Sequence, residues 1–205
     1  MKLTKENITF IDNYLKNSGV SYSDVRYEMT DHVATTLEEK EGDFLENFMV
    51  YMARNKKYIM QSNRQFAKAA RKRALWLLLQ NMIKPHSLVF MVALFLVLYM
   101  AVTTFGVNTV KDVLGIIYSL LLVCLLLFYK FSIGYHKSKF SVLDKLISTL
   151  LIITYVVFVF LRPNKLIDNP MLITIYYAAF TSFITINVYT FYVLSKKYKL
   201  QYNYE

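Results

Sequence analysis

Four long apolar segments in the second part of the chain constrain its fold more than any other feature. These uncharged stretches lie between Lys84 and Lys111, Asp112 and Lys130, Lys145 and Arg162, and Asp168 and Lys196. A helix that crosses a membrane needs about 20 predominantly apolar residues. The sequence therefore predicts four transmembrane helices, at about residues 87–105, 113–129, 146–161 and 171–194.

The second and third apolar runs are short for membrane spans. They hold 17 and 16 residues between their flanking charges, and at about 1.5 Å per residue this covers roughly 24–26 Å. The hydrocarbon core of a bilayer is about 30 Å thick. Snorkelling of basic side chains or local thinning of the bilayer would supply the difference. The alternative is a buried hairpin of two soluble helices, which the basic flanking loops and almost purely apolar composition disfavour.

Charge is distributed unevenly along the chain. Residues 1–53 carry ten acidic and five basic side chains, residues 54–86 carry nine basic and no acidic ones, and residues 87–205 carry ten basic and four acidic ones. A basic segment directly before an apolar run is typical of contact with an anionic membrane surface. Residues 64–73 lack the aromatic platform that single-stranded nucleic acid needs, so we expect no direct nucleic-acid partner.

The first 60 residues predict a small domain of three helices. Apolar residues recur at helical spacing in three segments, which begin near residues 5, 23 and 44. Thr4 and Asp43 suit helix N-caps, Gly19 suits the end of the first helix, and either Ser21 or Ser23 suits the start of the second. The apolar residues that we expect the third helix to bury are Phe44, Leu45, Phe48, Met49 and Met52.

Residues 61–84 predict a basic amphipathic helix. It ends before Pro85, because proline disfavours helix at the residue that precedes it. We expect this helix to lie in the membrane interface, with its tryptophan at the level of the headgroups. The alternative is a fourth helix of the N-terminal domain. The side chains expected to contact anionic headgroups are Arg64, Lys68, Arg71, Lys72, Arg73 and Trp76.

The basic residues also predict the orientation in the membrane. Thirteen lysines and arginines lie on the side that holds the N-terminal domain, the middle loop and the tail at residues 196–205, and three lie on the opposite side. Loops rich in lysine and arginine remain in the cytoplasm. The start of the chain lacks the apolar stretch of a secretory signal. We therefore expect both termini to be cytoplasmic.

The most notable polar cluster lies on the second helix, where Glu28, Asp31 and His32 share one face. Two carboxylates and an imidazole at this spacing are suited to a divalent metal. Zinc hydrolase motifs, however, use two histidines on one helix face, and no second ligand group follows here. We expect no catalytic residue, no cofactor and no metal. The face instead favours contact with a neighbouring helix or with a protein partner, through Glu28, Asp31, His32, Glu38 and Glu39.

The fourth apolar run is the least hydrophobic of the four. Small and hydroxyl side chains recur in it at spacings of three or four residues, which lets helices approach and form hydrogen bonds. The residues expected to pack in this way are Thr174, Ala178, Thr181, Ser182 and Thr185. They line the interior of the four-helix bundle, a contact with another subunit, or a substrate path. No run carries an ionisable side chain near its centre, which disfavours proton-coupled pumps and ion-gated transporters.

Short motifs in residues 4–60 resemble the HAAS-type helical domain, which precedes membrane spans in bacterial proteins often encoded beside PadR-like regulators. They are Phe10-Ile11-Asp12-Asn13-Tyr14-Leu15, Val25-x-x-Glu28-x-x-Asp31-His32-Val33, and Gly42 with Glu46 and Phe48. Residues 12–20 and 31–34 look most like an uncharacterised four-span group from Bacteroidota. The resemblance implies a signalling or regulatory module of the bacterial inner membrane, without a catalytic residue.

The sequence thus predicts an all-α chain with four parts. These are a cytoplasmic helical domain at residues 1–60, a juxtamembrane helix at 61–84, a four-helix transmembrane bundle at 85–195 and a basic tail at 196–205. The leading hypothesis is a non-enzymatic regulatory or adaptor protein of the inner membrane that docks a protein partner through its acidic head. The alternative is a small channel or transporter subunit that uses the fourth run. The sequence leaves open whether the chain forms a homo-oligomer.

Overall fold

The computed structural model describes residues 2–131, 139–160, 163–167 and 169–201. Apart from an isolated backbone bridge between Tyr22 and Lys139, the regular structure in these ranges is helical, as the sequence predicts. The elements are α1 (Lys5–Asn17), α2 (Ser23–Glu38), α3 (Phe44–Ile83), α4 (Pro85–Phe105), α5 (Val107–Tyr129), α6 (Ser141–Tyr155), the π-helical turn η2 (Val156–Phe160), α7 (Pro163–Leu166) and α8 (Pro170–Gln201).

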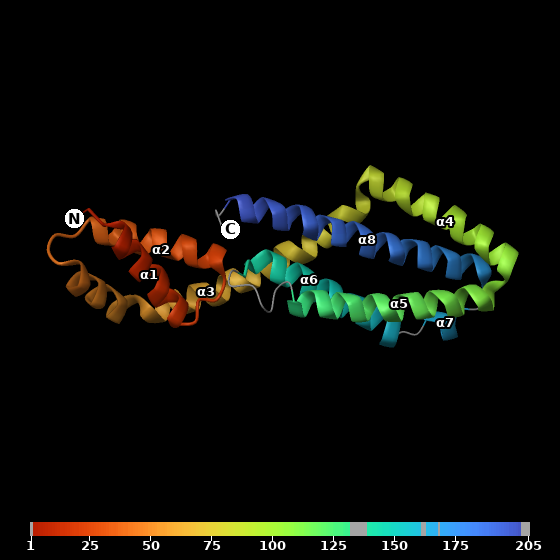
Figure 1. Cartoon of the computed structure of the whole chain (residues 1–205), viewed down its shortest axis with the longest axis horizontal. Helices are drawn as coiled ribbons and strands as arrows, with labels where there is room; N and C mark the ends of the chain where they lie inside the picture. The colour runs from red at the N-terminus through yellow and green to blue at the C-terminus, as the bar shows by residue number, and fades with distance from the viewer. Residues whose placement is uncertain (1, 132–138, 161–162, 168, 202–205) are drawn as a thin grey trace.

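The molecule has two parts that meet end to end (Figure 1). The helices α1 and α2 and the first part of α3 lie at one end, and the helices α4 to α8 extend toward the other. We call α1, α2 and residues 44–60 of α3 the head. We call the helices α4 to α8 the bundle, and residues 61–83 of α3 connect the two. The C-terminal end of α8 returns to α2, where Gln201 lies beside Asp24 and Tyr27. The long helices α3 and α8 therefore both reach from the bundle to the head.

The head has one hydrophobic core. Phe48 of α3 is fully buried in it, and the rings of Phe10 and Tyr14 lie edge-on at 5.3 and 5.1 Å from its ring centre. An ion pair joins the first two helices, with Arg26 Nε at 2.8 Å from Asp12 Oδ1. The other buried apolar residues of this core are Leu3, Ile11, Leu15, Val20, Val25, Met29, Val33, Leu37, Tyr51, Met52 and Ile59.

Local capping explains where the helices of the head begin and end. Thr4 accepts a hydrogen bond from the Asn7 N–H, and Asp43 accepts bonds from the first N–H groups of α3, so both predicted N-caps are confirmed. Gly19 follows α1 with a φ of 100°, a left-handed conformation that glycine adopts readily. Neither predicted serine caps α2. Its N-cap is Tyr22, whose side chain makes no capping bond.

The helix α3 is continuous over 40 residues, whereas the sequence predicts separate helices on either side of residue 60. It contains no glycine or proline, the residues that most often break a helix. At about 1.5 Å per residue it is about 60 Å long. The first half buries Phe48 and Met52 in the head, but Leu45 and Met49 are exposed, contrary to the prediction, because only one face meets the core. The second half packs against α6 and α8.

Within the residues that the structure describes, four helices are long and apolar enough to cross a membrane, by length and composition. They cover Pro85–Phe105, Val107–Tyr129, Ser141–Phe160 and Pro170–Tyr198. The second and third are longer than predicted, at 23 and 20 residues, or about 30–35 Å. The helices continue through polar residues at which the apolar runs stop, including Lys111 and Asp112 in α5 and Asp144 and Lys145 in α6. No thinning of the bilayer is needed to accommodate them.

The helices α6 and α8 form the centre of the bundle, and α4 and α5 lie outside them. The helix α8 packs along α4, and α6 packs against α3, α5 and α8. Ala74 and Leu78 of α3 are fully buried against α6, in a cluster that includes Leu146 and Leu150. Most side chains of α4 and α5 are exposed, and large exposed apolar surfaces of this kind mark contact with a membrane or another protein.

Candidate functional site: the junction between head and bundle

The first residues of α2 cap the N-terminus of α6. The two residues that form this cap, Asp24 and Ser141, lie 117 positions apart in the sequence. The Asp24 carboxylate accepts hydrogen bonds from the Ser141 N–H at 3.0 and 3.1 Å and from the Ser141 hydroxyl at 2.5 Å. In return, the Ser23 N–H donates to the Lys139 carbonyl at 2.7 Å. A carboxylate at a helix N-terminus satisfies free N–H groups and interacts favourably with the helix dipole. The two helix starts therefore satisfy each other.

A second set of polar contacts surrounds Asp144, which is 7% exposed. The Tyr22 hydroxyl donates to Asp144 Oδ2 at 2.8 Å, the Tyr129 hydroxyl donates to Oδ1 at 3.1 Å, and Lys145 Nζ lies 3.1 Å from Oδ2. The Lys145 ammonium also lies 5.5 Å from the centre of the Tyr22 ring. Burial is the largest cause of a raised pKa at Tyr22. Both carboxylate oxygens of Asp144 accept hydrogen bonds, and one also forms an ion pair with Lys145. These contacts offset the cost of burying a charged side chain.

A third contact fixes α3 to the bundle. Asn81, which is 1% exposed, donates from Nδ2 to the Thr190 hydroxyl of α8 at 2.7 Å. The backbone carbonyl of Asn81 accepts a bond from the Ser87 hydroxyl of α4 at 2.5 Å. One residue of α3 therefore joins two helices of the bundle, directly before the turn at Lys84 and Pro85. The long helix α3 is held in the head by its first half and in the bundle by its second half.

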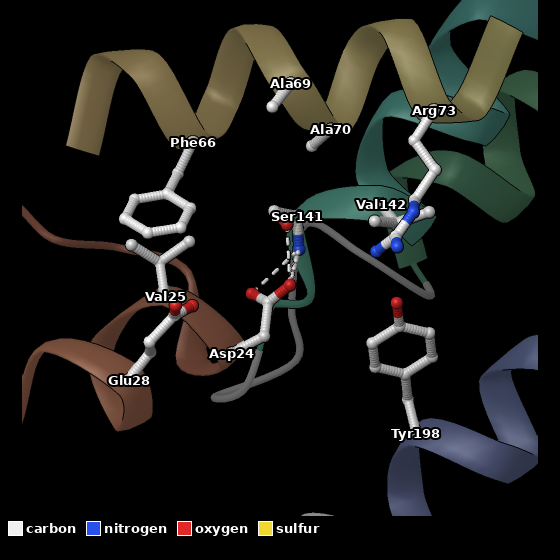
Figure 2. A pocket seen from close by; sticks show the side chains of 10 residues that line it. All are labelled: Asp24, Val25, Glu28, Phe66, Ala69, Ala70, Arg73, Ser141, Val142 and Tyr198. Carbon is white, nitrogen blue, oxygen red and sulfur yellow. Dashed lines mark hydrogen bonds between the residues drawn. The ribbon is translucent and has the colours of Figure 1, made fainter. Parts of the chain in front are cut away.

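A pocket of about 220 Å³ lies beside the contact between Asp24 and Ser141 (Figure 2). Its walls come from α2, α3, α6 and α8. Figure 2 shows Arg73 of α3 and Tyr198 of α8 pointing toward one another, with Asp24 between them and Glu28. The pocket therefore combines two carboxylates on one side with a guanidinium group on the other.

The acidic residues predicted to bind a partner are accessible in the structure. Glu28, Asp31, His32, Glu38 and Glu39 are all exposed on or directly after α2. The opposite face of the helix fills the head core. Glu28 and His32 also border a second pocket of about 260 Å³ between α2 and α3. Across the described ranges, no three His, Cys, Asp or Glu side chains gather closely enough to hold a metal ion.

The residues predicted to contact the membrane surface are exposed along α3. They are Arg64, Lys68, Arg71, Lys72, Arg73 and Trp76. The exposed side chains change character along the helix, because the basic residues end at Arg73 and exposed Leu75, Trp76, Leu79 and Ile83 follow. The prediction did not place Arg73 in a pocket, and its neighbours there come from three other helices.

The residues predicted to pack α8 divide into two groups. Thr174, Ala178 and Ser182 are buried, and Thr181 is partly buried and shares a hydrogen bond with Tyr118 of α5. Thr185 is exposed, so it does not belong to the buried face. The prediction assumed that residues 174, 178, 181 and 185 share one face of the helix. In the structure the buried face of α8 instead continues through Ser182 and Ile186.

The sequence reasoning missed the junction itself. No pattern in the sequence predicted the contact of Asp24 with Ser141 or that of Tyr22 with Asp144. The available signal was the charged pair Asp144–Lys145 directly before the third apolar run, which holds 16 residues. Its partners, Tyr22 and Asp24, lie about 120 residues earlier, and no local pattern links them.

Comparisons of the chain with protein-family models, with curated proteins and with solved structures find no match. The resemblance of residues 4–60 to a HAAS-type domain therefore stays a prediction.

Proposed function

We propose that this chain is a non-enzymatic regulatory or adaptor protein of the bacterial inner membrane, whose cytoplasmic head docks a protein partner. One observation carries the proposal. The helix α2 is bonded to α6 at its first residues, through Asp24 and Ser141, while its acidic face remains exposed. One rigid helix thus links an accessible surface to a helix long enough to span the membrane.

The junction supplies a physical route for regulation. A partner that binds the acidic face more tightly when the head is docked stabilises the docked state, and one that prefers the released head does the opposite. By the same linkage, a change in the packing of α6 changes the affinity for the partner. The size of such a shift is set by how much more tightly the partner binds one state than the other.

The distribution of basic residues supports a cytoplasmic head. Arg64, Lys68, Arg71 and Lys72 are exposed on α3, on the head side of the apolar helices, and Lys196 and Lys197 are exposed near the end of α8. At the far end of the spans, Lys111 is buried. Basic residues next to spans favour the cytoplasmic side. Anionic headgroups are the lipid partner that these side chains suit.

Purification of the full-length protein from its native membrane tests the docking proposal. The test variant reverses four charges, Glu28→Lys, Asp31→Lys, Glu38→Lys and Glu39→Lys, and Glu6→Lys on α1 is the control. We expect a protein to copurify in a fixed ratio with the wild type and with the control, but not with the test variant. Equal recovery of every partner by all three proteins would refute docking through the acidic face.

A second candidate function, a small channel or transporter subunit, has one specific observation in its favour. Within the described part of the bundle, the Ser182 hydroxyl and Asn187 Oδ1 are buried and lack a hydrogen-bond partner. Buried polar groups without partners are costly, and water or a polar solute in the bundle would satisfy them. Solute flux in reconstituted vesicles tests this function, and flux equal to that of empty vesicles would contradict it.

A further inference from the structure

We infer that the pocket between head and bundle binds a ligand that carries both a phosphate and a primary ammonium group, namely the headgroup of an ethanolamine phospholipid. This inference goes beyond the proposed docking of a protein, because the ligand is a lipid and the site lies between four helices, with Glu28 at the border it shares with the acidic face. The pocket is the one in Figure 2, beside the contact between Asp24 and Ser141.

The position of the pocket along α3 is the first argument. Arg73 lines the pocket, and the exposed residues directly after it are Leu75 and Trp76. Tryptophan is enriched at the level of the headgroups in membrane proteins. The exposed surface of α3 thus changes from basic to apolar within one turn of Arg73. A pocket at this boundary opens where phospholipid headgroups lie.

The charges in the pocket are the second argument. In the part of the chain that the structure describes, neither the Arg73 guanidinium nor the Glu28 carboxylate forms a salt bridge. Figure 2 shows Arg73 and Glu28 on opposite sides, with Asp24 between them. A purely anionic ligand would meet two carboxylates, and a purely cationic ligand would meet the guanidinium. A zwitterion places its phosphate at Arg73 and its ammonium at Glu28.

The chemistry of each side fits its half of the headgroup. Arginine forms paired, charge-assisted hydrogen bonds with phosphate oxygens. The Tyr198 hydroxyl lies on the same side of the pocket in Figure 2. On the other side, Asp24 is held in place by its bonds to Ser141, and a carboxylate has more acceptor sites than these bonds use. A primary ammonium group has three donors and suits two neighbouring carboxylates.

The remaining walls leave room for the headgroup. They are formed by Val25, Phe66, Ala69, Ala70 and Val142. The two adjacent alanines, Ala69 and Ala70 of α3, present only methyl groups to the pocket in Figure 2. The volume is about 220 Å³, whereas one water molecule needs only about 15 Å³ of such space. A larger side chain at Ala69, which is exposed, would fill the pocket without disturbing the buried core.

Native mass spectrometry of the full-length protein in detergent tests the inference, with phosphatidylethanolamine and phosphatidylglycerol supplied in equal amounts. We expect the wild type to retain phosphatidylethanolamine in preference. Arg73→Ala, Glu28→Gln and Ala69→Leu should each weaken this binding by about tenfold or more, as expected for the loss of a charged contact or of space. Lys68→Ala, which removes a basic residue of α3 outside the pocket, and Glu39→Gln should not.

Four outcomes would overturn the inference or one of its parts. Equal retention of the two lipids, or equal loss in Lys68→Ala and Arg73→Ala, would show a general attraction to the basic surface. A competition experiment then distinguishes a bound lipid from a soluble molecule that carries the same phosphate and ammonium groups. We expect free phosphoethanolamine to compete only weakly and inorganic phosphate not at all. Binding of phosphoethanolamine as tight as that of the lipid would overturn the assignment to a lipid, and displacement by phosphate alone would overturn the role of Glu28.

Discussion

The substitution Asp24→Ala should loosen the contact between α2 and α6, while the head and the bundle stay folded and joined through the continuous helix α3. The Asp24 carboxylate accepts bonds from two donors of Ser141, its N–H and its hydroxyl. Ser141 is the first residue of α6, so its N–H has no acceptor within that helix. Alanine cannot replace the carboxylate, and water would take its place when the contact opens.

The expected magnitude follows from these bonds. A hydrogen bond to a charged group contributes about 1.5–3 kcal/mol, and loss of a helix N-cap costs about 1 kcal/mol. Asp24 is partly exposed, so solvent screening reduces the sum. We expect a loss of about 2–3 kcal/mol in the free energy of the contact between α2 and α6, which corresponds to a shift of about 30- to 150-fold toward the open contact.

Hydrogen–deuterium exchange read by mass spectrometry measures this shift in the full-length protein. Peptides that cover residues 139–146 should take up deuterium faster in Asp24→Ala than in the wild type, while peptides from the head core keep their protection. Asp31→Ala, two turns along the same helix, is the control and should leave the exchange unchanged. Unchanged uptake at residues 139–146 in Asp24→Ala would refute the view that this contact holds α2 against α6.

Three further predictions test other parts of the structure. Phe48→Ala should destabilise the head by about 3–5 kcal/mol, measured by thermal unfolding, whereas the exposed neighbour Met49→Ala should cost less than about 0.5 kcal/mol; equal losses would contradict the packing of α3. Asn81→Ala should cost about 1 kcal/mol in detergent by removing the bond to Thr190, and no loss would show that α3 is not held there. The raised pKa of Tyr22 means that its neutral form is favoured in the docked state. The stabilisation it gives should therefore be complete below about pH 10 and lost as the pH rises through the folded value; exchange at residues 139–146 should rise there in the wild type, and an identical rise in Tyr22→Phe would contradict this role.

Local signals predicted much of the fold. Apolar runs identified four helices that can cross a membrane, and Thr4, Gly19 and Asp43 marked helix ends, because capping and membrane burial depend on neighbouring residues. The change of composition near residue 60 predicted a helix boundary that does not exist. It marks a change in what α3 contacts, from head core to bundle, and a helix without glycine or proline continues through such a change.

The candidate site was only partly predictable. Glu28 and Arg73 were both selected as surface residues, and both are exposed, but their presence in one pocket depends on how α2, α3, α6 and α8 meet. The contact of Asp24 with Ser141 and that of Tyr22 with Asp144 join residues more than 115 positions apart. Hydropathy also placed the start of the third run after Lys145, whereas the helix α6 begins four residues before that lysine, at Ser141.

Partner recovery by three proteins purified from native membranes tests whether the acidic face of α2 docks a partner. They are the wild type, the variant with four reversed charges on the acidic face, and Asp24→Ala. We expect the face variant to lose the partner and Asp24→Ala to change its recovery several-fold, because partner binding and the contact with α6 are linked through α2. Equal recovery with all three proteins, or no protein in a fixed ratio with the wild type, would contradict this expectation.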